Sequence, residues 1–270
     1  MSHLPFKIAG LGVPAGGTGI LLRLLESHPA VATPIRSSAV LSKAAVSVEE
    51  MNTLSQSVNR ATAGLTGVYL TDTFGQPHCA RLINQYLPEA RLLLVVRNPL
   101  DCLVATYEVA KERGQTKVGE SCAEFIARQP KLQTAVLYSD TLSDLYSYYG
   151  ATSLYVVLYD DLRDQPVKTM QQVFTFLEID DTFVPPAIAH YIPKPESIGR
   201  PAWWRRLGAW MLRPLLQRLK RKPAPVVPSP FNLDDYFSIT ERESLLAWYR
   251  PDMVTLSTLL HKDMVAKWGS

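Results

Sequence analysis

The 270-residue sequence has few cysteines, no long apolar run and no recognisable leader peptide. Its three cysteines, Cys79, Cys102 and Cys122, are spaced neither as CxxC pairs nor as metal ligands, so we expect free thiols in a reducing compartment. No stretch of about 18 apolar residues could form a transmembrane helix. The start, MSHLPFKIAG, lacks the basic and apolar regions of a signal peptide. These absences favour a soluble, cytoplasmic protein.

Acidic residues are missing from one segment although the whole chain is nearly balanced, with a net charge of +3. Between positions 205 and 222 every charged residue is basic. The sequence of residues 203–222, WWRRLGAWMLRPLLQRLKRK, predicts a basic amphipathic helix that Pro214 interrupts. Such a helix suits a peripheral membrane contact, an anionic glycan or an oligomer contact, or it packs on the core with its basic face in water. Nucleic acid is disfavoured because no recognition fold accompanies the segment.

The hydrophobic pattern predicts an α/β fold. Strand-like apolar runs occupy residues 6–13, 67–70, 91–96 and 153–159. Helical patterns lie between or after them at residues 19–27, 77–86, 100–113, 122–149 and 166–177. This alternation indicates a central parallel sheet covered by helices on both faces. Ligands bind beyond the carboxyl ends of such strands, so we expect the site in the turns after Val13, Leu70, Val96 and Tyr159.

The remaining part of the chain departs from this alternation. Residues 184–232 are rich in proline and predict a long excursion, partly loop and partly helix. Two helices are expected after it, at residues 240–249 and 251–260, the first capped by Ser238 or Thr240. We interpret residues 1–270 as a single domain that carries this excursion.

In the sequence GLGVPAGGTGILL, residues 10–22, four glycines crowd one turn between an apolar run and a helical pattern: Gly12, Gly16, Gly17 and Gly19. A strand that ends in such a turn and opens a helix gathers backbone N–H groups around an anion, and the helix dipole adds positive potential. The turn contains no Lys or Arg, and Thr18 stands where a nucleoside-triphosphate loop needs Lys. The alternative is a glycine-rich turn before a core helix.

Other stretches follow the glycine turn in a definite order. RNPLD (residues 97–101) follows RLLLVV, YDDL (residues 159–162) follows LYVVL, FTFLE comes one helix later, and WYRPD (residues 248–252) lies near the end. Together with VPAGGTGILLRLLESHP, these stretches resemble the sulfotransferase family that uses 3′-phosphoadenosine 5′-phosphosulfate (PAPS). The resemblance implies a three-layer P-loop-NTPase-like fold. It also implies transfer of a sulfuryl group from PAPS to a hydroxyl or amine, without a metal, leaving adenosine 3′,5′-bisphosphate.

The resemblance also implies which residues hold the donor. Gly17 and Thr18 match the Gly-Thr pair of the loop that grips the 5′-phosphosulfate. The backbone of Gly16, Gly17, Thr18 and Gly19 is expected to hold that group, with the Thr18 hydroxyl as a donor to phosphate. Arg97 matches the arginine that holds the 3′-phosphate, and a guanidinium can grip phosphate through two parallel hydrogen bonds. The alternative for Arg97 is an ion pair with Asp101, four residues on.

Three positions depart from the family pattern. Ala15 stands where the family has a Lys or Arg, Gly19 replaces a Thr, and Ala105 replaces a Ser that helps to hold the 3′-phosphate. Sulfuryl transfer places negative charge on the leaving group, and loss of one group that stabilises such charge typically costs about 10²–10³ in rate. Arg36 and Lys43 are candidate replacements close in sequence. Arg200 and Arg205, in SIGRPAWWRR, are better placed because this stretch resembles the family's C-terminal loop, and the alternative for all four is a solvated surface charge.

A general base must take the proton of the acceptor. Asp72, just past the strand at residues 67–70, is the first candidate, and its alternative role is the N-cap of the next helix. His78 is a weaker candidate, and His28 matches a structural turn of the family.

Two functions are therefore expected, with a third that fits less well. The chain is a PAPS-dependent sulfotransferase with a small-molecule, lipid or glycan acceptor, or it is a catalytically impaired relative that binds or scaffolds. The third is a nucleotide kinase, which would need ATP and magnesium. It fits less well because the glycine turn lacks the Lys that such a kinase uses to bind phosphate.

Overall fold

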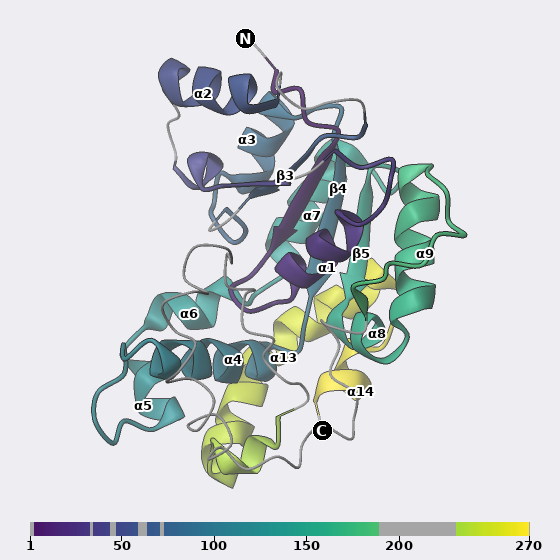
Figure 1. Ribbon diagram of the computed structural model, residues 1–270. Helices are drawn as coiled ribbons and strands as arrows, with labels where there is room; N and C mark the ends of the chain where they lie inside the picture. Colours follow the sequence, from purple (N-terminus) through teal and green to yellow (C-terminus); the bar gives the residue numbers. More distant parts are fainter. Residues whose placement is uncertain are drawn as a thin grey trace, which may run out of the picture.

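The computed structural model describes residues 3–32, 35–43, 47–58, 64–70, 73–188 and 231–269. A five-stranded sheet in the order β2-β3-β1-β4-β5 forms its centre (Figure 1). The strands are β1 (Ile8–Gly12), β2 (Arg36–Ser38), β3 (Gly67–Leu70), β4 (Arg91–Val96) and β5 (Leu154–Leu158). Every neighbouring pair is parallel. The carboxyl ends of the strands therefore meet at one edge of the sheet.

The central strands are buried on both faces, as their continuous apolar sequences predict. Successive side chains point to opposite faces, so β4 sends Leu92, Leu94 and Val96 into one core cluster and Leu93 and Val95 into the other.

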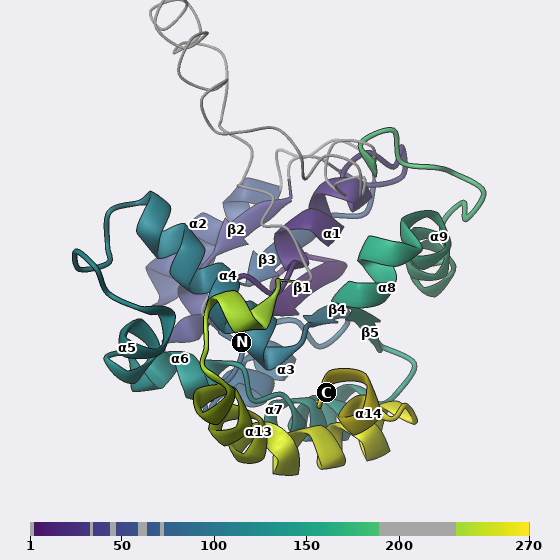
Figure 2. The same ribbon diagram turned by 90° about the horizontal axis from the view of Figure 1, so that it is seen from below.

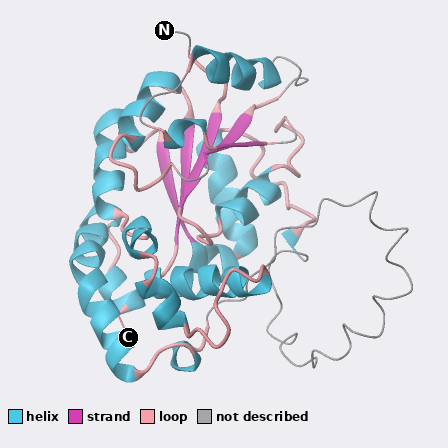
Figure 3. Ribbon diagram, turned by 90° about the vertical axis from the view of Figure 1, so that its left-hand side faces the viewer, coloured by secondary structure: helices cyan, strands magenta, loops and turns pink. Residues whose placement is uncertain are grey.

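Helices cover both faces of the sheet, and this confirms the expected three-layer α/β architecture (Figures 2 and 3). One face carries α1 (Thr18–Leu25), α8 (Tyr159–Asp164) and α9 (Pro166–Leu177). The other face carries α3 (Cys79–Tyr86) and α7 (Ser139–Tyr149), and α13 (Ile239–Leu260) packs against α7.

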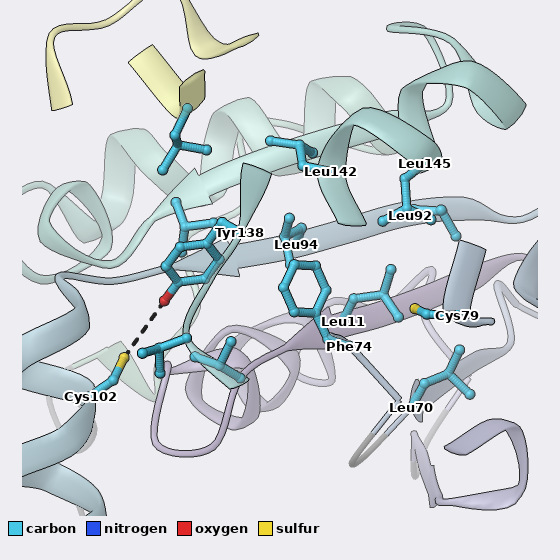
Figure 4. Packing of buried hydrophobic residues seen from close by; sticks show 14 of the residues in the cluster. Leu11, Leu70, Phe74, Cys79, Leu92, Leu94, Cys102, Tyr138, Leu142 and Leu145 are labelled. Atoms are coloured by element: carbon cyan, nitrogen blue, oxygen red, sulfur yellow. Dashed lines mark hydrogen bonds between the residues drawn. The ribbon is translucent and has the colours of Figure 1, made fainter. Parts of the chain in front are cut away.

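The larger core cluster lies between the sheet and α7. Figure 4 shows Phe74 and Tyr138 close to Leu11 and Leu94, with Leu142 of α7 near them. The further helices are α2 (Val48–Val58), α4 (Pro99–Glu112), α5 (Cys122–Ala127), α6 (Pro130–Ala135) and α14 (Met264–Trp268).

The helical pattern at residues 122–149 forms three helices rather than one. Pro130 occupies the first turn of α6, where its missing N–H costs nothing, and it separates α6 from α5. The third helix, α7, begins at Ser139 because its first N–H groups are accepted by a carboxylate from α13.

At the C-terminal end the sequence predicted two helices, but the structure has one. The helix α13 runs continuously through Pro251. Tyr249, Asp252, Met253 and Leu256 are buried on both sides of this proline. Packing therefore outweighs the roughly 3 kcal/mol that an interior proline costs. Ser238 caps the helix in a capping box with Glu241, as one of the two expected caps.

The strand β2 and the helices α2, α8 and α14 were not expected from the sequence. Each is short or weakly patterned, and β2 has only three residues at the edge of the sheet.

The three cysteines are free, as expected, and all three are buried. No helix within the described ranges is both long and apolar enough to cross a membrane. Asp72, Arg200 and residues 203–222 lie outside the described residues, as does most of the expected excursion at residues 184–232.

Candidate functional site

The glycine turn joins the end of β1 to the start of α1 and is tightly packed. Gly17 adopts φ 99°, which favours glycine, and a Cβ there would overlap the ring of Tyr159. A Cβ at Gly12 would overlap the hydroxyl of Thr18. By contrast, nothing lies within 4 Å of the position that a Cβ at Gly19 would take. Gly12 and Gly17 are thus required because the Thr18 and Tyr159 side chains pack directly against them. A Cβ at position 19 would meet no neighbour among the described residues.

The turn leaves backbone donors free. The Gly16 N–H donates to the Val13 carbonyl at 3.0 Å. The N–H groups of Gly17, Thr18 and Gly19 have no acceptor among the described residues. These groups belong to the N-terminus of α1, whose dipole places partial positive charge at the same point. The turn therefore offers a cluster of donors suited to an oxyanion.

Thr18 differs from the expectation for its side chain. The residue is 1% exposed, and its hydroxyl donates to the Leu11 carbonyl at 2.9 Å. The proton that was expected to serve a phosphate is thus used to tie α1 to β1, and the backbone N–H of Thr18 remains as its free donor.

Arg97 follows β4 and is the largest fully buried side chain of the described residues, at 1% exposed. Its Nη1 donates to the Ala15 carbonyl of the glycine turn at 2.8 Å. The guanidinium carbon lies 4.4 Å from the centre of the Tyr159 ring and 5.7 Å from that of Phe231. Cation–π contact of this kind is a favourable setting for a buried guanidinium.

Two donors of Arg97 are unsatisfied. Nε and Nη2 are buried and have no hydrogen-bond partner in the described part of the chain. The alternative expectation, an ion pair with Asp101, is therefore not found. Leaving buried, charged N–H donors without acceptors costs free energy, so such donors are candidates for binding a ligand.

Residues from two distant helices hold the Arg97 backbone in place. The Tyr138 hydroxyl donates to the Arg97 carbonyl at 2.9 Å and accepts from the Arg97 N–H at 3.2 Å. Asp252 accepts hydrogen bonds from the backbone N–H groups of Tyr138 and Ser139. Burial raises the pKa of Tyr138 well above its ordinary value, which keeps this hydroxyl protonated.

A polar cavity of about 410 Å³ adjoins this region. Its lining includes Asn98 at the start of α4, Asp160 and Arg163 of α8, and Phe231, which also contacts Arg97. Arg163 lies 3.4 Å from Asp160 and 2.7 Å from Asp164, so charges of both signs face each other in the cavity wall. Arg97 itself does not line the cavity, but it is joined to the cavity wall through the Phe231 ring and through Asn98, the next residue in the chain.

The other predicted site residues lie as follows. Ala15 is partly exposed in the turn at φ 55°, and its carbonyl accepts a hydrogen bond from Arg97. Ala105 is fully buried in α4 and presents no polar atom. His28 is also buried: its Nδ1 accepts from the Ala30 N–H and its Nε2 bonds the Asp180 carbonyl, as expected of a structural residue. The His78 ring bonds the Ser42 carbonyl.

Sequence reasoning missed Tyr138 and the roles of Asp252 and Tyr159. Asp252 and Tyr159 both lie in stretches that matched the family pattern, WYRPD and YDDL, so their positions carried a signal. Tyr138 carried none, because its function depends on Arg97, which is 41 residues away in the chain.

In the part of the chain that is described, no group of three or more His, Cys, Asp or Glu side chains could hold a metal ion. The expectation of a metal-independent reaction stays a prediction.

Comparison with known proteins gives a consistent result. No curated protein sequence matches the chain. A sulfotransferase from Alicyclobacillus acidocaldarius superposes with a TM-score of 0.69 at 17% identity, covering 98% of this chain and 99% of that one. The mouse sulfotransferase SULT7A1 complexed with PAP gives 0.60 at 12% identity, covering 94% and 85%. These similarities to solved structures show the fold alone.

The family is shown by the sequence, because residues 10–191 match the sulfotransferase domain family. The chain therefore belongs to the sulfotransferase family, as the resemblance implied.

Proposed function

We propose that this protein binds PAPS and transfers its sulfuryl group to a hydroxyl or amine. The observation that carries the proposal is the pair of unsatisfied donors on buried Arg97, next to the free N–H groups of the glycine turn. Both sets of donors call for an oxyanion, and PAPS carries phosphate groups at two positions. In this proposal PAPS is the co-substrate, and adenosine 3′,5′-bisphosphate is released.

The residues present fit the donor. Gly17, Thr18 and Gly19 offer backbone N–H groups, which depend on the fold rather than on side-chain chemistry. Arg97 offers a guanidinium with two buried donor atoms, Nε and Nη2, that have no acceptor among the described residues. Preorganised donors of this type stabilise negative charge more strongly than water does.

Proton removal from the acceptor requires a base, and Asp72 stays the proposed one because it comes two positions after β3 in the sequence, and the carboxyl end of β3 lies at the same edge of the sheet as those of β1 and β4. Arg200 stays a proposed cation over the donor. The acceptor is proposed to be a small molecule, a lipid or a glycan. Residues 203–222 remain a proposed contact with a membrane surface or with a second copy of the chain.

Calorimetric titration with adenosine 3′,5′-bisphosphate tests the donor assignment. We expect saturable binding, and we expect ATP with magnesium to bind more weakly because the turn lacks the Lys of a nucleotide kinase. Failure of the bisphosphate to bind at millimolar concentration would contradict the proposal.

A second candidate function rests on Ala15, which brings no charge to the turn. A catalytically impaired relative would bind the bisphosphate but transfer nothing. Incubation with sulfur-labelled PAPS and a pool of hydroxyl and amine compounds separates the two functions. A labelled product supports the enzyme, and binding without any labelled product supports the scaffold.

A further inference from the structure

The last helix of the chain, α14, lies beside α8 (Figure 1). Both acidic residues in the first turn of α8 bond to α14 or to the turn before it. The Trp268 indole N–H donates to the Asp160 carboxylate at 3.0 Å. Asp161 pairs with Lys262 at 3.3 Å and with Lys267 at 3.7 Å. The start of α8 is therefore held by a segment that lies 101 to 108 residues further along the chain.

The start of α8 depends on such contacts because the helix is short. It has six residues, and its N-cap residue, Leu158, has no polar side chain to cap it. Isolated helices shorter than about 12 residues are marginal in water, so tertiary contacts must hold this one. Its first residue is Tyr159, whose ring lies 4.4 Å from the guanidinium carbon of Arg97 and packs against Gly17. The bonds from α14 therefore fix the helical turn that directs Tyr159 toward Arg97.

Trp268 also contacts the other residue that supports Arg97. The centre of its ring lies 6.3 Å from that of Tyr138, within the range of aromatic contact. Tyr138 in turn bonds both the N–H and the carbonyl of Arg97. Trp268 is 3% exposed, so its indole is packed among these groups rather than lying on the surface. One side chain therefore touches both supports of Arg97, through Asp160 on α8 and through the ring of Tyr138.

We propose that Trp268 is a positioning residue of the donor site: it orients Tyr159 and Tyr138, and through them it orients Arg97. Trp268 lies beyond residues 10–191, so the match to the sulfotransferase family does not reach it. The inference rests on the proposed function, because it assumes that the donor binds Arg97. Its basis is the indole hydrogen bond to Asp160 together with the ring contact to Tyr138.

Trp268→Phe keeps an aromatic ring but removes the indole N–H. Calorimetric titration with adenosine 3′,5′-bisphosphate should show binding weakened by about 3- to 30-fold, the range typical of residues that act on a site through packed neighbours. Trp248→Phe is the matched control, because Trp248 is 44% exposed on α13 and its ring contacts Tyr249. The control should bind within about twofold of the unaltered protein. An unchanged affinity in a folded Trp268→Phe variant would overturn the inference.

A double-mutant cycle distinguishes positioning from a general loss of structure. Arg97→Lys keeps the positive charge but removes the planar guanidinium that Tyr159 holds in place. If Trp268 acts through Arg97, adding Trp268→Phe to Arg97→Lys should weaken bisphosphate binding by less than about a further twofold. Fully additive losses would contradict the proposal, because Trp268 would then act on binding by a route that does not include Arg97.

Asp160→Asn tests the same contact from the other side and replaces Trp268→Phe if that variant does not fold. The amide keeps the shape of the carboxylate, but its hydrogen bond with the indole lacks the charge. Bisphosphate affinity should fall by about threefold or more, and the fall should again disappear in the Arg97→Lys background. A variant that binds as tightly as the unaltered protein would count against the proposal.

Failure of the two proposals can be told apart. If the unaltered protein does not bind adenosine 3′,5′-bisphosphate, the proposed function is wrong and the role of Trp268 falls with it. If the unaltered protein binds the bisphosphate and Trp268→Phe binds it equally well, the proposed function stands and only the inference about Trp268 fails.

Discussion

At the scale of single residues, two glycines of the same turn differ in whether a side chain could replace their hydrogen. Gly17 has a positive φ and lies against Tyr159, whereas Gly19 lies in the first turn of α1 with open space around it. We expect Gly17→Ala to lower the free energy of unfolding by more than about 1 kcal/mol, because alanine is strained at this φ and its methyl group displaces the ring. The displaced ring no longer supports Arg97, so affinity for adenosine 3′,5′-bisphosphate should fall as well.

Gly19→Ala is the matched control for this prediction. Alanine there removes backbone freedom from the unfolded chain without a clash, so stability should rise by about 0.4–1 kcal/mol. Urea unfolding of both variants, followed by calorimetric titration of each, measures the contrast. Equal effects of the two substitutions would contradict the packing described for the turn.

At the scale of secondary-structure elements, Asp252 joins two helices that are distant in sequence. Its carboxylate lies on α13 and accepts the Ser139 N–H at 2.8 Å and the Tyr138 N–H at 3.1 Å, so it caps α7 from outside. We expect Asp252→Asn to lower the free energy of unfolding by about 1–2 kcal/mol, because a neutral amide with one acceptor oxygen replaces a charged cap. Since Tyr138 clamps Arg97, bisphosphate affinity should fall in the same variant.

Asp140→Asn is the control for the cap. Asp140 lies exposed in the first turn of the same helix, so its loss removes only a favourable charge near the helix dipole, about 0.3–1 kcal/mol. Chemical denaturation provides the comparison. If Asp140→Asn destabilised the protein as much as Asp252→Asn does, the conclusion that the Asp252 carboxylate stabilises α7 as a cap would be wrong.

At the scale of the whole molecule, the buried thiols set an alkaline limit to stability. Burial raises the pKa of Cys102 to about 11 and the pKa values of Cys79 and Cys122 to about 12. An unfolded thiol titrates near pH 8.5, so between about pH 8.5 and 11 the folded state holds more protons than the unfolded state. The free energy of unfolding should therefore decrease as pH rises through this window, by up to about 1.4 kcal/mol per pH unit for each thiol.

Urea unfolding at pH 8, 9 and 10 checks this alkaline limb. Cys102→Ala removes one of the titrating groups, so its stability should fall less steeply over the same range, whatever its stability at pH 8. An identical slope in the variant would contradict the assignment of the limb to buried thiols.

The main lines of the fold are encoded locally in the sequence. Continuous apolar runs predicted β1, β3, β4 and β5 to within a few residues, and the helical pattern at residues 166–177 matches α9 in full. Parallel pairing then placed the glycine turn and Arg97 at one edge of the sheet, since the carboxyl ends of parallel strands coincide. These predictions succeeded because they depend on neighbours within a few positions along the chain.

The tertiary structure alone decided which hydrogen-bonding groups of the candidate site have partners within the protein and which do not. Thr18 carries a suitable hydroxyl, but close approach to Leu11 uses its proton. Arg97 reaches a carbonyl 82 residues away, and Asp252 caps a helix through an N–H 114 residues away. No local pattern records such separations. The sequence by itself determined that a glycine turn and an arginine share one edge of a parallel sheet. Only long-range packing decided that the arginine turns toward Ala15 and keeps one edge unsatisfied, because burial and partner choice depend on every segment that packs around it.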